Sequence, residues 1–267
     1  MNELESIWEK PLYLPYIQPP LTAELLEDAE KKIGYKLPNE YIELLKTQNG
    51  GYIRKTLPGF EHTLIYGIGP HYPSLTDVDW SEYNDWVSFK LDGLVPFDDD
   101  GHLFMCLDYR QDRLNPQIAL IAPDSEIQSI VADSFAEYLS KLVVKTDGEF
   151  VIETNESIEK VAKDIEQSLG VEFEAPNSYE QGYPIYRSNI NGQWMWLSPN
   201  LVPKGFVRRD DDRYNELKQL ANGEATRFPE VAKSSLLISF SNEETEKRAL
   251  AKLRESSIAI RPLSEFV

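Results

Sequence analysis

The residues best suited to recognise a partner lie between Asp77 and Phe89, where aromatic and acidic side chains alternate. Aromatic rings recur at every third position of this stretch, at Trp80, Tyr83, Trp86 and Phe89, between the carboxylates of Asp77, Asp79, Glu82 and Asp85. Large aromatic side chains beside uniform negative charge are typical of a binding hot spot that faces a basic partner. A spacing of three also fits one face of a short helix that packs into the core with its acids in water. Both interpretations stay open, and both hold if only some of the rings are buried.

A second acidic cluster, Asp98-Asp99-Asp100-Gly101, is a candidate calcium site because adjacent carboxylates attract that ion. An EF-hand loop that started at Asp98 would place Leu103 where the glycine belongs and Tyr109 where the bidentate glutamate belongs, so this loop type is excluded. The pattern instead predicts a tight turn between strands, in which Gly101 takes the unusual backbone angles and the three carboxylates remain in solvent. A surface turn of this kind can contact a partner.

Motifs for catalysis or for a cofactor are missing from the sequence. The histidines are neither paired at helical metal-site spacing nor set in a HExxH pattern, and they stand at His62, His71 and His102. No Gly-x-Ser-x-Gly elbow occurs, and Pro70 directly follows Gly67-x-Gly69, so this loop would not lead into a phosphate-binding helix. We therefore expect no catalytic residue, no cofactor and no metal.

Cys106 is the single cysteine of the 267 residues, which excludes an internal disulfide and a zinc site built on thiolates. It lies in an apolar stretch, so we expect a buried strand residue.

The net charge of the chain limits the kinds of partner that it can bind. Lys and Arg number 27 against 45 Asp and Glu, a net charge of −18. Residues 1–150 carry 12 basic and 26 acidic side chains, whereas residues 151–267 carry 15 and 19. Such a chain repels phosphate backbones, so we expect no direct binding of nucleic acid. The first residues, 1–5, are acidic where a secretory signal is basic, and no apolar run approaches bilayer length; we expect a cytoplasmic protein without a membrane partner.

Two short helices are predicted near the beginning of the chain, after an extended arm of residues 1–20 that is rich in proline and aromatic residues. Thr22 can cap the first helix and Gly34 can stop it. Pro38 fits the first turn of the second helix, which Asn49-Gly50-Gly51 ends.

Short strands broken by Gly and Pro follow, at residues 52–54, 63–66, 102–107 and 117–121. Ser134 and Glu137 have the spacing of a capping box, which predicts a last helix whose apolar face includes Phe135 and Tyr138.

This succession resembles the SUKH superfamily, which includes fungal regulators of cell-wall synthesis and many bacterial immunity proteins against toxins. The resemblance rests on Leu37-Pro38-Asn39-Glu40-Tyr41 with Asn49-Gly50-Gly51, on the stretch 94–108 and on the helix at 134–139. It covers residues from about 20 to about 145. The implied fold is α+β, with a mostly antiparallel sheet flanked by helices.

A second, smaller α+β domain is expected after a boundary near the polar stretch 145–149, so that the chain comprises an arm (1–20), a SUKH-like domain (21–147) and a C-terminal domain (148–267). Asn191-Gly192 is a strong hairpin signal. Helices are expected at 158–169 and around 217–221, the second of them stopped at residues 222–223. A strand at 236–240, a helix capped by Ser241 with Glu244, and a strand at 257–260 complete this half.

The resemblance implies a non-enzymatic immunity protein or antitoxin, which neutralises a cognate toxin such as a nuclease by binding it. The acidic composition independently suits a toxin with a basic surface, which would bind to an acidic face of this chain. The residues expected to contact this toxin are Trp80, Glu82, Asp85, Trp86, Asp98, Asp99 and Asp100. A regulatory scaffold of the cell-wall-synthesis type is the alternative, and an enzyme that acts through carboxylates is a third candidate.

Overall fold

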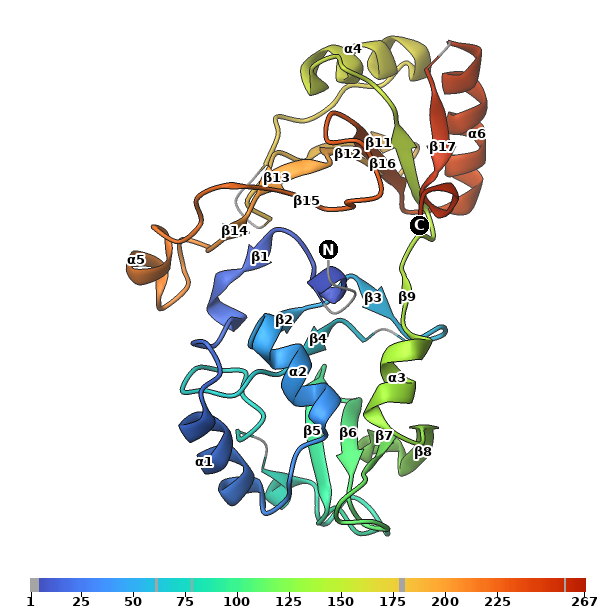
Figure 1. Ribbon diagram of the computed structural model, residues 1–267. Coiled ribbons are helices and arrows are strands. Elements are labelled where there is room, and N and C mark those ends of the chain that lie inside the picture. Colours follow the sequence, from blue (N-terminus) through green and yellow to red (C-terminus); the bar gives the residue numbers. More distant parts are fainter. Residues whose placement is uncertain (1–4, 61, 78, 178–180, 257) are drawn as a thin grey trace. The chain divides into compact units, whose positions relative to one another are not determined.

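The computed structural model describes residues 5–60, 62–77, 79–177, 181–256 and 258–267 (Figure 1). The chain has the expected α+β fold and divides into two compact units, an N-terminal unit (residues 1–144) and a C-terminal unit (residues 145–267). Independent folding of these units as domains stays a prediction. Among the described residues no helix is both long and apolar enough to cross a bilayer.

The N-terminal unit contains three α-helices among its described residues, and local signals set their ends. They are α1 (Ala23–Ile33), α2 (Asn39–Thr47) and α3 (Phe135–Lys141). Thr22 Oγ1 accepts a hydrogen bond from Leu25 N–H at 3.2 Å, and Gly34 ends α1 in the left-handed conformation. Ser134 Oγ caps α3 through Glu137 N–H at 3.1 Å, as the capping box predicts. The pattern placed Pro38 in the first turn of α2; the helix begins one residue later.

An antiparallel sheet in the order β5-β6-β7-β8 forms the centre of this unit. Its strands are β5 (Leu94–Asp99), β6 (Phe104–Asp108), β7 (Gln117–Ala122) and β8 (Ile127–Ala132). Shorter strands pair as β2 (Gly51–Tyr52) with β4 (Leu64–Ile65) and as β3 (Lys55–Thr56) with β9 (Val143–Val144).

Strand β6 is buried on both faces of this sheet. Met105 and Leu107 belong to the main core, together with residues of α2 and α3. Phe104 and Cys106 point to the opposite face and form a smaller core with the segment that follows Asp79. Cys106 is fully buried, as expected for a strand residue, and burial raises the pKa of its thiol.

The segment before α1 is part of the same core. It contains 3-10 turns at Glu5–Ile7 and Leu14–Tyr16 and the strand β1 (Leu12–Tyr13), so it is less extended than predicted. Trp8 is 3% exposed, and its indole N–H donates to Thr47 Oγ1 at 3.0 Å. Residues 1–4, the greater part of the acidic start of the chain, lie outside the described residues.

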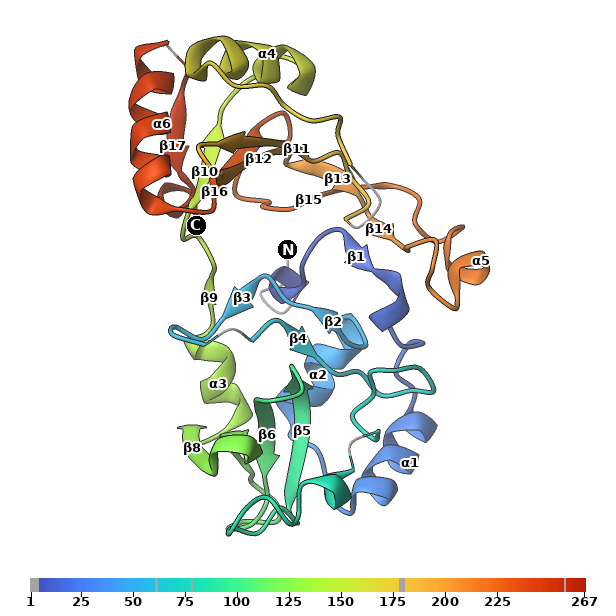
Figure 2. The ribbon, with the colours of Figure 1, turned by 180° about the vertical axis from the view of Figure 1, so that it is seen from behind.

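The C-terminal unit is built on an antiparallel sheet in the order β11-β12-β16-β10-β17 (Figures 1 and 2). These strands are β10 (Glu149–Ile152), β11 (Tyr186–Ile190), β12 (Gln193–Pro199), β16 (Leu236–Phe240) and β17 (Ile260–Pro262). Two helices, α4 (Ile158–Leu169) and α6 (Glu243–Glu255), pack against one sheet face. Smaller elements are β13 (Leu201–Pro203), β14 (Gly205–Phe206), α5 (Tyr214–Leu217) and β15 (Glu224–Thr226).

The structure of this half differs from the prediction at three places. Asn242, and not Ser241, caps α6, because its side chain accepts hydrogen bonds from two backbone N–H groups, whereas Ser241 Oγ accepts one from Trp194. The helix expected around 217–221 is α5, which ends at Leu217. The final strand begins at Ile260, and residue 257 of the predicted strand lies outside the described residues. The Asn191-Gly192 hairpin is confirmed, since both residues have positive φ.

Candidate partner-binding surface

The aromatic residues between Asp77 and Phe89 cover the second face of the N-terminal sheet. The Trp80 indole N–H donates to Leu94 O at 2.9 Å, and its ring centroid lies 4.9 Å from that of Phe104. The Tyr83 ring lies 5.3 Å from the same phenylalanine. The Trp86 and Tyr83 rings form a T-shaped pair with centroids 5.2 Å apart, and Trp86 is 54% exposed. Trp80 and Tyr83 therefore pack against the core, as the second of the two interpretations requires, whereas Trp86 remains available to a partner. Val78 of this stretch lies outside the described residues.

The acidic turn at Asp98 to Asp100 differs from the expectation in one of its three carboxylates. Asp98 is 7% exposed and not in solvent as predicted. Strand β5 has a register shift between Pro96 and Asp98, which pairs Asp98 with the buried Met105. Because paired residues share a sheet face, this bulge turns the carboxylate inward. Asp98 is therefore a poor candidate for partner contact, while Asp99 is half-buried and Asp100 is exposed.

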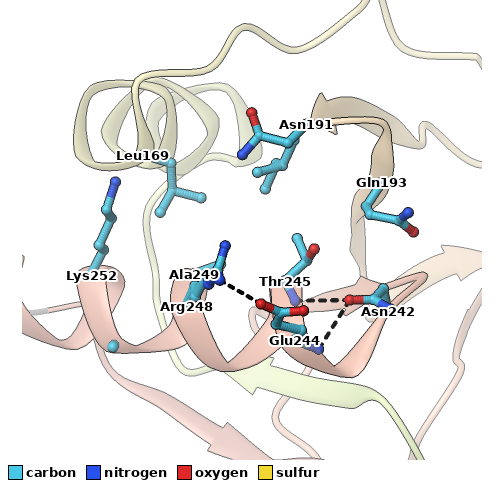
Figure 3. A pocket seen from close by; sticks show the side chains of 11 residues that line it. Leu169, Asn191, Gln193, Asn242, Glu244, Thr245, Arg248, Ala249 and Lys252 are labelled. Carbon is cyan, nitrogen blue, oxygen red and sulfur yellow. Dashed lines mark hydrogen bonds and ion pairs between the residues drawn. The ribbon is translucent and has the colours of Figure 1, made fainter.

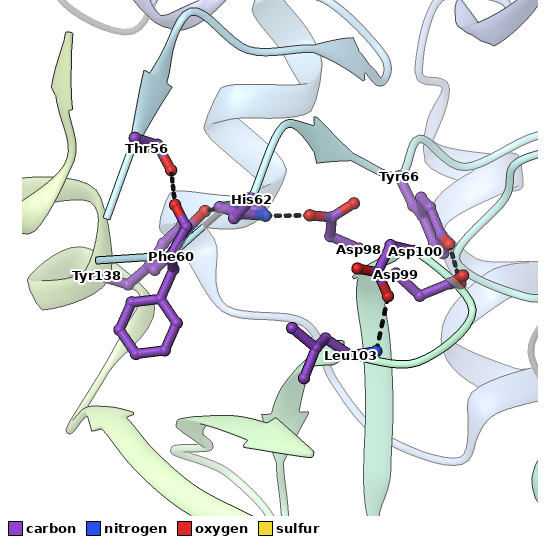
Figure 4. Close-up of polar contacts among 9 residues, drawn as sticks. All are labelled: Thr56, Phe60, His62, Tyr66, Asp98, Asp99, Asp100, Leu103 and Tyr138. Atoms are coloured by element: carbon purple, nitrogen blue, oxygen red, sulfur yellow. Dashed lines mark hydrogen bonds and ion pairs between the residues drawn. The ribbon is translucent and has the colours of Figure 1, made fainter. Parts of the chain in front are cut away.

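Inside the unit, Asp98 ends a chain of polar contacts (Figure 4). Its Oδ2 bonds His62 Nδ1, and His62 Nε2 bonds the Tyr138 hydroxyl. A base that one acid orients toward a hydroxyl has the form of a catalytic triad. However, Tyr138 is fully buried, and burial raises the pKa of its hydroxyl, so no reachable nucleophile results. This arrangement links β5 to α3 in the core.

An acidic–aromatic pocket of about 310 Å³ brings together segments that are far apart in sequence. We use this name for the hollow lined by Tyr66, Tyr72, Ser74, Asp77, Asp79, Ser81, Glu82, Tyr83, Asp99 and Phe104. Glu82 and Asp99 are thus the predicted contact residues that line it. Asp85 and Trp86 are exposed outside its lining, and Asp100 lines a neighbouring hollow of about 320 Å³ that shares Asp99 (Figure 4).

Three of the four carboxylates of the acidic–aromatic pocket, those of Asp77, Asp79 and Asp99, accept hydrogen bonds from neutral donors. Ser81 N–H donates to Asp79 at 2.8 Å, and this backbone hydrogen bond keeps the pKa of Asp79 below its ordinary value. The Tyr66 hydroxyl donates to Asp99. Tyr72 is largely exposed, but partial burial of its hydroxyl, followed by the charge of Asp99, raises its pKa, so this side chain stays neutral. No basic side chain is among the described residues that line the pocket. The site therefore keeps its negative charge for an external cation.

Sequence reasoning missed Tyr66, Tyr72 and Phe104 as pocket residues. Tyr72 stands on a loop that Gln18 clamps, since the Gln18 amide accepts from His71 N–H at 3.1 Å and donates to Pro73 O at 3.0 Å. The sequence feature that could have indicated Tyr72 is an aromatic residue between two prolines, Pro70 and Pro73, beside an acidic stretch.

In the part of the chain that the structure describes, no group of three His, Cys, Asp or Glu side chains is arranged to hold an ion.

Comparison with known proteins agrees with the architecture of the N-terminal unit. Residues 20–141 match the model of the SMI1 / KNR4 family (SUKH-1), which confirms the resemblance seen in the sequence. The match supports a function of the immunity-protein or cell-wall-regulator kind. Comparison with curated proteins gives no match.

Proposed function

Residues 20–141 form a SUKH domain, and from this premise we propose that the protein is a non-enzymatic immunity protein. It acts in the cytoplasm by binding a cognate toxin whose contact surface is basic. The acidic–aromatic pocket, with the exposed Glu82, Asp85 and Trp86 at or near it, is the contact surface of this proposal. No bond is made or broken, because the toxin is neutralised by occlusion.

The observation that carries the proposal is the uncompensated charge beside exposed aromatic rings. Between residues 77 and 100 the sequence holds eight carboxylates and a single base, Lys90. Opposite charges on two proteins raise the association rate and favour one orientation. Tyr72 and Trp86 are 70% and 54% exposed, and aromatic faces also attract Arg and Lys side chains. A toxin that acts on nucleic acid would present such cations.

A regulatory scaffold of the cell-wall type is the second candidate, since the same family contains both kinds of protein. A scaffold should bind several host proteins, whereas an immunity protein should bind essentially one. An enzyme that acts through carboxylates finds less support, because the buried contact between His62 and Asp98 ends on an inaccessible tyrosine.

The experiment is affinity capture of the tagged full-length protein from the lysate of its own cell, with washes at low and then high salt. We expect one stoichiometric partner with a basic toxin domain that high salt removes. The double variant Glu82→Lys/Asp85→Lys should lose this partner. Both side chains are exposed and have no ion pair or hydrogen bond among the described residues, so the fold should tolerate the change.

The matched control is Glu24→Lys/Asp28→Lys on α1, which changes the net charge equally at two exposed positions outside the pocket. Equal loss of the partner in both double variants would show that overall charge, and not this surface, determines binding. Recovery of many signalling or wall-synthesis proteins would favour the scaffold.

A further inference from the structure

A groove of about 690 Å³ in the C-terminal unit has no role in the proposed toxin contact (Figure 3). It lies between the end of α4, the turn of the β11–β12 hairpin and the exposed side of α6. This volume falls in the range of pockets that hold small ligands.

The groove combines an apolar surface with a net positive rim. Leu169, Ile190 and Ala249 supply the apolar surface. The charged residues that line it are Glu244, Arg248 and Lys252. An excess of basic residues is unusual in a chain whose net charge is −18, so the groove is a local exception to the acidic field.

Among the described residues, the polar groups of the groove without a protein partner include those of Lys252 and Asn191. Glu244 forms an ion pair with Arg248, which uses part of the charge of that guanidinium. Lys252 has no ion pair, and the Asn191 amide has no hydrogen bond, among the residues that the structure describes. Figure 3 shows the Asn191 amide pointing from the hairpin toward the end of α4, where Leu169 lies between this amide and Lys252. One ammonium and one amide therefore remain available beside an apolar surface.

We propose that this groove binds a small apolar carboxylate. The carboxylate accepts hydrogen bonds from Lys252 and Asn191, and the apolar body of the ligand covers Leu169, Ile190 and Ala249. One unpaired cation matches the single charge of a carboxylate better than the double charge of a phosphate. The same chemistry occurs in a short fatty acid and in the free C-terminus of an apolar peptide.

The test is an NMR titration of the full-length protein with octanoate and with N-acetyl-leucyl-leucine, each beside its neutral carboxamide. We expect shifts confined to the groove residues, with a dissociation constant on the order of 1 mM for at least one acid. The matching carboxamide should bind about fivefold more weakly or worse. Binding of octanoate alone would identify a small acid as the ligand class, and binding of the dipeptide alone would identify a peptide terminus.

Lys252→Gln should weaken the acid by about fivefold, and Lys247→Gln is the matched control. Lys247 lies on the same helix and carries the same charge, but it pairs with Glu243 and does not line the groove. The proposal is overturned if neither acid shifts these signals up to about 10 mM, if the carboxamides bind equally well, or if both lysine variants have the same effect.

Discussion

Asn49 is the residue of the Asn-Gly-Gly signature whose replacement should cost the N-terminal unit most stability. Its side chain is 3% exposed and makes three hydrogen bonds to backbone groups. The amide donates to Pro19 O at 2.6 Å and to Ile68 O at 2.8 Å, and its oxygen accepts from Ile68 N–H at 2.8 Å. This one side chain thus joins the segment before α1, the end of α2 and the loop that leads to Tyr72.

The change Asn49→Ala leaves the buried N–H and C=O of Ile68 without these partners. A buried unsatisfied group costs about 1–3 kcal/mol, so the loss of partners for these two groups should cost about 2–6 kcal/mol of unfolding free energy. Water cannot easily replace the amide, because the backbones of residues 49 and 67 are in contact: a Cβ at Gly67 would lie 2.3 Å from Asn49 O. Such a loss is a large part of the ordinary stability of a domain, about 5–15 kcal/mol.

The assay is urea unfolding followed by tryptophan fluorescence, with hydrogen exchange of residues 67–75 as a local readout. The control is Asn84→Ala, at an exposed asparagine, which should change the unfolding free energy by less than about 0.5 kcal/mol. If Asn49→Ala lay within about 1 kcal/mol of the unchanged protein, the account of these hydrogen bonds would be refuted.

Two further predictions concern buried polar residues. Asn200 is fully buried, accepts a hydrogen bond from Phe228 N–H at 2.9 Å and donates one to Phe228 O at 3.0 Å. Asn200→Ala should therefore speed hydrogen exchange in residues 145–267 and leave residues 1–144 protected. Equal loss of protection in both units would contradict their independent folding. Burial raises the pKa of Asp98 above its ordinary 3.8, so the folded state favours the neutral acid. The stability that this proton contributes is present below pH 3.8 and is lost as the pH rises through the raised value. The side chain of the Asp98→Asn variant cannot ionise. As the pH rises from 3.8 through the raised pKa, the unfolding free energy of the unchanged protein should therefore fall relative to that of the variant. If chemical denaturation gave parallel pH profiles of unfolding free energy for the two proteins, this effect of Asp98 ionisation would be excluded.

The helix ends and the hairpin were predictable because their causes are local. Thr22, Gly34 and Ser134 act on backbone groups within four residues, and Asn191-Gly192 determines its own turn. The cap of α6 was misplaced by one residue because Ser241 and Asn242 are both good capping residues, and a contact with the neighbouring β12 occupies the serine.

The interior position of Asp98 could not be predicted, because it depends on the pairing of β5 with β6 and on a bulge within that pair. The acidic–aromatic pocket was predictable only in part for the same reason. Glu82 and Asp99 stood out by charge, but Tyr66, Tyr72 and Phe104 join them through long-range packing and through the clamp that Gln18 forms.

The most direct test of the proposed function is the affinity of the captured toxin for this protein, measured by calorimetry across a series of salt concentrations. The account predicts that affinity falls as salt rises, that Glu82→Lys/Asp85→Lys weakens binding and flattens this dependence, and that Glu24→Lys/Asp28→Lys does so far less. If Glu82→Lys/Asp85→Lys bound the toxin with unchanged affinity and unchanged salt dependence, the acidic–aromatic pocket would not be the contact surface.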